Sequence, residues 1–218
     1  SRGLGDVYKR QLETSLKREY LETNGLGGYA SATVVGVRTR KYHGLLVAPT
    51  HPPVGRHLLA ADLEEAVIVQ GKRIPISTHQ YIDTIYPEGF RYLREFRLDP
   101  FPVFVYEIEG LLLEKTIFMC YGENTTCILY RIRRLPKGIR QGQILLEVRP
   151  LLAMRSHHDL VREDPNCKLR FDAQPASVTF ELDGKPPLTM MFAGARFEHQ
   201  PYWYRNFFYP REAESGYQ

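Results

Sequence analysis

The pattern that most constrains the fold of this chain is a hydrophobic alternation with a period of two. In the stretch SVTFELDG, Val178, Phe180 and Leu182 alternate with polar or charged side chains. The stretches CILYRIRR, from Cys127, and PVFVYEIEG, from Pro102, repeat this alternation. A strand with one buried face has this period, whereas an amphipathic helix places apolar residues three or four positions apart. The alternation therefore predicts β-strands.

Turn signals separate the alternating runs. They include Gln70-Gly71-Lys72, Glu109-Gly110 and Asp183-Gly184-Lys185. The spacing predicts about a dozen short strands, which is typical of an antiparallel sandwich or barrel. Only Leu12–Glu22 and Arg155–Arg162 are candidate helices, and both are short. We predict one all-β domain, a large antiparallel two-sheet β-sandwich with few short helices.

Composition and charge narrow the function classes. The chain has 218 residues, of which 43% are hydrophobic and 25% charged, and a net charge of +4. Without a dense basic block or a long apolar run, we predict neither a nucleic-acid nor a membrane partner. The chain has three cysteines without metal-type spacing, which predicts free thiols in a reducing compartment and therefore a cytoplasmic protein. We predict no metal and no cofactor. Residues 1–11 lack apolar periodicity and an initiator methionine, so we expect them to be a non-native segment and 12–218 to be the domain.

The stretch NGLGGYA, from Asn24 to Ala30, matches a loose form of the dinucleotide-binding fingerprint. That fingerprint has meaning only between a strand and a helix, with an acidic residue about 20 positions later. Here the next acidic residue is Asp62, and the residues after the glycines end in β-branched side chains. The sequence thus disfavours a nucleotide site. Glycines also permit positive φ and close backbone approach, so a structural turn is the competing interpretation.

Two further segments bring polar or aromatic side chains together. PLLAMRSHHDL places two adjacent histidines after an apolar strand. On an extended chain their side chains point to opposite faces, which disfavours a shared zinc ion and favours a His–Asp pair within the loop. HQPYWYRNFFYPRE is dense in aromatic residues, which suit either a carbohydrate groove or a face packed against a neighbouring domain.

The stretch EYLETNGLGGYASATVVGVRTRKYHGLLVA resembles the opening motif of bacterial and archaeal glycogen debranching enzymes. PPVGRHLLAADLEE, RPLLAMRSHHDL and WYRNFFYPRE resemble later landmarks of the same N-terminal domain, in the same order. The resemblance covers Glu19 to Glu212. It implies a β-sandwich of the supersandwich type that precedes an (α/α)6 barrel, and it places the catalytic acid and base in that barrel. The end of the chain, EAESGYQ, departs from the acidic residue and Arg-Gly pair usual in the family.

The resemblance implies the non-catalytic N-terminal portion of an enzyme that hydrolyses α-1,6 branch points in glycogen or related α-glucans. The expected partners are an α-glucan (glycogen or maltodextrin) and the enzyme's own C-terminal catalytic domain. The alternative is a stand-alone carbohydrate-binding sandwich without enzymatic activity. No catalytic residue is predicted in this chain. The residues predicted to bind substrate or to form the domain interface are Asn24, Gly25, Gly27, Gly28, Tyr29, Arg38, Arg40, Tyr42, His43, Arg155, His157, His158, Trp203 and Tyr204.

Overall fold

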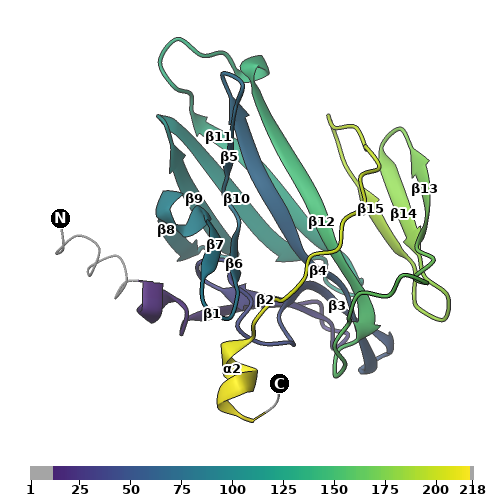
Figure 1. Ribbon diagram of the computed structural model, residues 1–218. Helices are drawn as coiled ribbons and strands as arrows, with labels where there is room; N and C mark the ends of the chain where they lie inside the picture. Colours follow the sequence, from purple (N-terminus) through teal and green to yellow (C-terminus); the bar gives the residue numbers. More distant parts are fainter. Residues whose placement is uncertain (1–11, 217–218) are drawn as a thin grey trace.

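The structure is a computed structural model that describes residues 12–216. Two antiparallel sheets form its main body (Figure 1). The larger sheet has the order β1-β2-β3-β4-β12, and β5 pairs with the far end of β4. Its strands are β1 (Glu19–Thr23), β2 (Tyr29–Thr33), β3 (Gly44–His51), β4 (Val54–Val69), β5 (Lys72–Pro75) and β12 (Ile144–Ser156). The second sheet comprises β8 (Leu93–Leu98), β9 (Pro102–Ile108), β10 (Leu111–Met119) and β11 (Thr126–Arg134).

The main core lies between these two sheets. Tyr20 of β1, Val67 of β4 and the inward residues of β9 and β10 are buried there. Phe104, Tyr106 and Ile108 of β9 are 2%, 5% and 0% exposed, as their alternation predicts. Two sheets packed through such a core make the domain an all-β sandwich, which confirms the predicted fold class.

Smaller elements complete the described part of the chain. β6 (Thr78–Gln80) pairs with β7 (Ile85–Glu88), and a third sheet contains β13 (Arg170–Gln174), β14 (Ser177–Glu181) and β15 (Leu188–Met191). Val178 and Phe180 of β14 pack with Met154 of β12, which attaches the third sheet to the sandwich. The short helical elements are residues 12–15, η1 (Gly89–Tyr92), η2 (Gln141–Gln143) and α2 (Pro210–Glu214).

A segment without regular secondary structure, residues 193–209, joins β15 to α2. We call it the strap. In Figure 1 it crosses β12 and β4 on the side of the large sheet that faces away from β8–β11. Tyr204 and Phe207 of the strap pack on a small cluster that contains Val47, Leu58 and Leu151. The strap therefore covers part of the second face of the large sheet.

One candidate helix is much shorter than predicted, and the other prediction was wrong. Within Leu12–Glu22 only residues 12–15 are helical, and β1 begins at Glu19 because this segment pairs with β2 and buries Tyr20. The Arg155–Arg162 segment contains the end of β12 and a loop instead. Conversely, α2 was not predicted, although Pro at its first turn followed by Arg-Glu-Ala-Glu is a recognisable helix start.

Candidate functional site

The glycine-rich stretch is a hairpin turn between β1 and β2, which we call the glycine turn (Asn24–Gly28). Its centre is the fully buried side chain of Asn24. The Asn24 amide donates to the Glu123 carbonyl and to Oδ1 of Asn124, and its Oδ1 accepts from the N–H groups of Leu26 and Gly28, each at 2.9 Å. The turn is thus bonded to itself and to the β10–β11 turn of its own domain.

Each glycine of this turn is required for a definable reason. Gly25 and Gly27 have φ of +77° and +92°, which L side chains adopt rarely. Gly28 lacks a positive φ, but a Cβ there would lie 2.6 Å from Nδ2 of Asn24 and 3.0 Å from Cδ of Pro49. The glycines therefore serve close packing within the domain. A strand follows them, and two of the turn's amides are used by Asn24, so the geometry differs from a phosphate-binding loop.

The basic segment after β2 separates into buried and exposed side chains. His43 is 3% exposed, and its Nδ1 accepts from the N–H of Thr39 at 3.1 Å. Burial lowers the pKa of His43 to about 4, so the ring is neutral at pH 7. Arg40 reaches the surface, where its Nε donates to Glu19 at 2.9 Å. His43 consequently has its main contacts inside the domain, while Arg40 is open to water.

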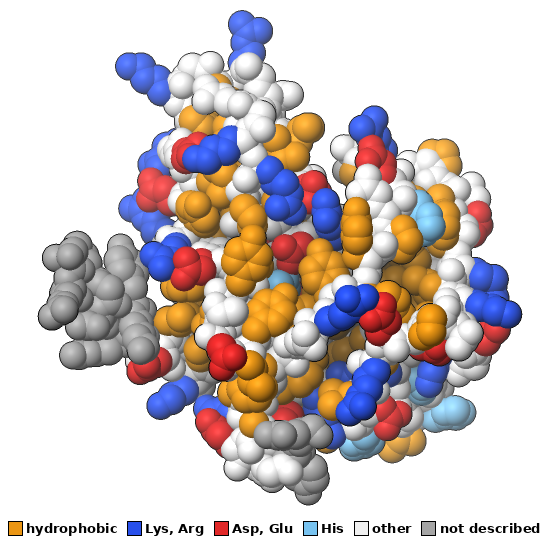
Figure 2. All heavy atoms as spheres, viewed as in Figure 1, with side chains coloured by type: hydrophobic (Ala, Val, Ile, Leu, Met, Phe, Trp, Pro, Cys, Tyr) orange, Lys and Arg blue, Asp and Glu red, His pale blue; other side chains and the backbone are white. Residues whose placement is uncertain are grey.

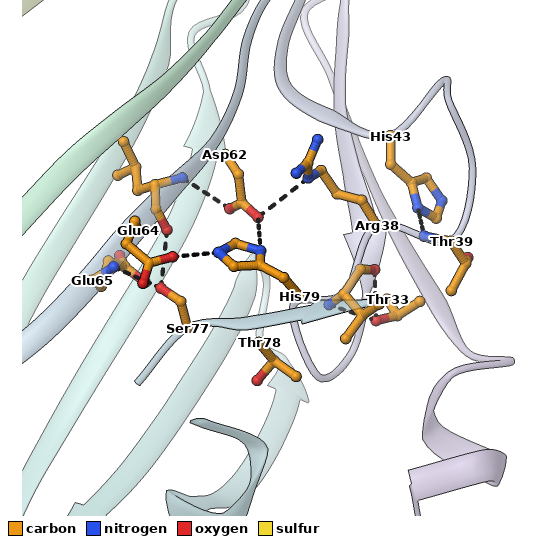
Figure 3. A network of polar contacts seen from close by, with 12 residues as sticks. Thr33, Arg38, Thr39, His43, Asp62, Glu64, Glu65, Ser77, Thr78 and His79 are labelled. Atoms are coloured by element: carbon orange, nitrogen blue, oxygen red, sulfur yellow. Dashed lines mark hydrogen bonds and ion pairs between the residues drawn. The ribbon is translucent and has the colours of Figure 1, made fainter. Parts of the chain in front are cut away.

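Arg38 belongs to a buried charged cluster that sequence reasoning missed (Figure 3). His79 lies between two carboxylates, with a short contact from Nε2 to Glu64 and a distance of 3.8 Å from Nδ1 to Oδ2 of Asp62. Nε of Arg38 lies 3.4 Å from the same Asp62 oxygen. The signal was present in ADLEEA, where three acids interrupt an apolar strand. His79 lies outside this stretch, and only the fold brings it next to Asp62 and Glu64.

The second predicted segment lies against the first. Nη2 of Arg155 donates to the Lys41 carbonyl at 2.6 Å, and Nζ of Lys41 donates to the His158 carbonyl at 2.9 Å. The Tyr42 ring makes edge contacts with the rings of His157 and His158. Tyr29 completes the group, because its hydroxyl donates to the Tyr42 carbonyl at 2.9 Å.

The geometry of the two histidines differs from the expectation. They occupy a turn after β12 instead of an extended chain, and their ring centroids lie 3.9 Å apart on the same side. Burial lowers the pKa of His157. Within residues 12–216, no group of three or more His, Cys, Asp or Glu side chains is arranged to hold a metal ion.

The third segment, the strap, has a buried and an exposed side. Phe207 stacks with Tyr204 and with Tyr81, and the Arg38 guanidinium lies 4.5 Å from its ring centroid. Trp203 is 41% exposed and Tyr202 is 65% exposed. Trp203 therefore presents its ring outward, whereas Tyr204 serves packing.

A long groove runs past the basic segment after β2, the second segment and the strap. It is bounded by the large sheet, the β13–β15 sheet and the strap, and Figure 2 shows hydrophobic side chains along this face, flanked by charged ones. From the predicted set it is lined by Arg38, Arg155, His158, Trp203 and Tyr204. The lining also includes Lys41, Arg149 and Tyr202, which were not predicted. The lining excludes the other predicted residues, namely the glycine turn, Tyr29, Arg40, Tyr42, His43 and His157.

The fold and the groove define a class of protein: an antiparallel β-sandwich domain with an aromatic and cationic surface groove. The family described as "Glycogen debranching enzyme N terminal" matches residues 18–218, and the chain belongs to this family. It is thus the N-terminal portion of a glycogen debranching enzyme, as the sequence resemblance implied. Searches of curated proteins and of solved structures gave no match. No helix within the described residues is long and apolar enough to cross a membrane.

Proposed function

We propose that this domain binds an α-glucan along the groove and packs against the catalytic domain of the debranching enzyme. The observation that carries the proposal is the juxtaposition of exposed aromatic rings and cations in one groove. Glycogen and maltodextrin chains offer both apolar sugar faces and many hydroxyl groups, so a site for them needs ring surfaces and hydrogen-bonding groups together. The free thiols described for the three cysteines fit a cytoplasmic enzyme.

Tyr202 and its neighbours supply both kinds of contact. The Arg149 guanidinium lies 5.7 Å from the Tyr202 ring centroid, and its Nε pairs with Glu147 at 3.0 Å. Arg73 donates to the same carboxylate at 2.7 Å. Planar guanidinium groups held in this way keep N–H donors in fixed directions, which suits recognition of sugar hydroxyls. Trp203 adds a second exposed ring on the same segment.

The residues of the glycine turn, together with His43, support a different part of the proposal. Asn24, Gly25, Gly27, Gly28 and His43 fix the shape of the loops at the β1–β2 end of the sandwich. We propose that this rigid end meets the (α/α)6 catalytic domain. Hydrolysis would occur there by paired carboxylates acting as acid and as base or nucleophile.

Glucan binding can be tested with the chain and maltoheptaose in a calorimetric titration. We expect Tyr202→Ala and Trp203→Ala each to weaken affinity roughly three- to tenfold, the value of one lost stacking contact. Tyr86→Ala is the matched control, because Tyr86 is also 65% exposed but does not line the groove. Equal affinities for all three variants and the parent would contradict the assignment of the groove.

Catalysis is tested separately, by glucose release from a branched limit dextrin. We expect no turnover by this chain above a heat-inactivated control, because the family resemblance places both catalytic carboxylates in the barrel. Turnover by the purified chain would overturn the division of roles proposed here.

A further inference from the structure

Two free cysteines lie in sulfur–sulfur contact at the turn that holds the glycine turn. Cys120 follows β10 and Cys127 lies in β11, and their Sγ atoms are 3.7 Å apart. Both are partly accessible to solvent. Cys127 also lines the groove, but the reaction of the two thiols with each other does not depend on glucan binding.

The residues between the two cysteines connect the two sheets. The N–H of Gly122 donates to the Asn24 carbonyl at 2.7 Å, while the Asn24 amide donates to Glu123 and Asn124. Nδ2 of Asn124 donates to the Pro49 carbonyl at 3.2 Å. A change in the position of Cys120 relative to Cys127 would therefore be transmitted to the glycine turn.

The local backbone favours a disulfide between Cys120 and Cys127. The N–H of Cys120 donates to the Thr125 carbonyl at 3.0 Å, so the chain is already folded back between the thiols. A disulfide needs an S–S distance of about 2.05 Å, so the sulfurs must approach by roughly 1.7 Å from their present 3.7 Å. Rotation of the side chains and a small movement of the turn supply such a distance.

We propose that Cys120 and Cys127 are a reversible redox-modification site, which glutathione disulfide or a similar low-molecular-weight disulfide converts to an intramolecular disulfide. The Cys120 thiolate attacks one glutathione sulfur, forming a mixed disulfide and releasing one glutathione thiolate. The Cys127 thiolate then attacks Sγ of Cys120 and releases the second glutathione. The protein loses two protons and two electrons, and the reagent gains them as two thiols.

The direction of attack follows from the surroundings of the two thiols. Burial, followed by the hydrogen bond with Cys120, raises the pKa of Cys127. A raised pKa lowers the thiolate fraction of Cys127, so we assign Cys127 the role of resolving thiol in the proposed sequence.

The test is incubation of the whole chain in a glutathione redox buffer, followed by thiol counting and peptide mass mapping. We expect a product about 2 Da lighter than the reduced chain, with the link between Cys120 and Cys127. Cys167→Ser should form the same link. Cys120→Ser and Cys127→Ser should form at most a glutathione adduct, about 305 Da heavier. The proposal would be overturned if Cys120 and Cys127 stayed free under these conditions. It would also be overturned by a glutathione adduct that persists in the parent chain, or by a disulfide to Cys167.

Coupling to the glycine turn has its own readout. The N–H groups of Leu26 and Gly28 bond to Asn24, so their hydrogen exchange reports local opening of this turn. We expect exchange at both amides to slow severalfold in the oxidised chain and to stay unchanged in similarly treated Cys120→Ser. If the disulfide forms while exchange is unaltered, the coupling is wrong.

Discussion

The glycine turn and the strap carry two of the most distinctive motifs of the chain, yet they are built in opposite ways. In the glycine turn the buried Asn24 side chain makes four hydrogen bonds, and the glycines leave no room for a Cβ. The strap has no regular secondary structure, and two of its large aromatic side chains are exposed. The glycine turn is thus closely packed, whereas the strap has side chains that a ligand can reach.

This difference separates structural from recognition roles among the predicted site residues. A side chain bonded on all sides within its own domain has no remaining donor or acceptor for a ligand. An exposed ring keeps its face available, although it adds little to folding. Substitutions in the glycine turn should therefore affect stability first, and substitutions on the outer side of the strap should affect binding.

The largest effect is expected for Gly28→Val. The new side chain would overlap Nδ2 of Asn24 and Cδ of Pro49 and would break the hydrogen bonds of Asn24. Overpacking together with unsatisfied buried groups should lower the free energy of unfolding by about 4 kcal/mol. Urea denaturation measures the change.

Gly142→Val is the control for Gly28→Val, because a Cβ at Gly142 meets no atom within 4 Å. Where Gly28→Val yields no folded protein, Gly28→Ala provides the milder comparison. A loss for Gly28→Ala no greater than that for Gly142→Ala would mean that the turn tolerates a Cβ and is not the rigid element described here.

The second prediction concerns pH and His43. The ordinary histidine pKa of 6.5 falls to about 4 in the folded chain. Between these pH values the unfolded chain binds a proton that the folded chain does not, so stability decreases as pH falls from 6.5 toward 4. Protonation of His43 should lower the free energy of unfolding by roughly 3 kcal/mol over this range.

Measuring the free energy of unfolding at several pH values for the parent and His43→Gln isolates this contribution. The variant should lack the part of the slope that lies between pH 4 and 6.5. His51→Gln, at an exposed position, is the control for removing a histidine from the chain. Identical slopes for the parent and His43→Gln would show that His43 is not held neutral by burial.

Phe207→Ala should have an intermediate effect. Its ring contacts Arg38, His79, Tyr81 and Tyr204, so it is the main anchor of the strap over the charged cluster. Loss of a half-buried aromatic ring should cost about 2 kcal/mol. Tyr202→Ala on the same strap, with an exposed ring, should change stability far less. Equal losses for both would remove the distinction between the two sides of the strap.

Much of the fold could be predicted because alternation and turn signals are local. β9 and β14 have the predicted buried faces, and Gly71, Gly110 and Gly184 occupy turns with positive φ. The contacts of the candidate site depend instead on residues far apart in the chain. Asn24 bonds to residues 99 and 100 positions away, and Arg155 to one 114 positions away. Local patterns contain no information on such pairs.

The same limit explains why the first candidate helix ends earlier than predicted. LETSLKREYLE has residues with good helix propensity, but pairing with β2 and burial of Tyr20 determine the conformation from Glu19 onward. The charged cluster was missed because its acids alternate within a strand. Alternating acids also fit a solvent-exposed face of a strand. Only the contacts with Arg38 and His79 show that these acids are in a buried cluster instead.

The smallest effect is expected for Arg205→Ala, although its ion pair is among the best aligned on the strap. Nε and Nη2 of Arg205 contact the two Glu163 oxygens at 2.6 Å each, with side chains 63% and 39% exposed. Water and salt screen such a pair, and two long side chains must be ordered to form it. The melting temperature should therefore change by less than about 1 °C, with Glu163→Ala and the double variant as partners in a mutant cycle. A salt-dependent drop of several degrees would show that electrostatics hold the strap, in which case the packing of Phe207 could not be its main anchor.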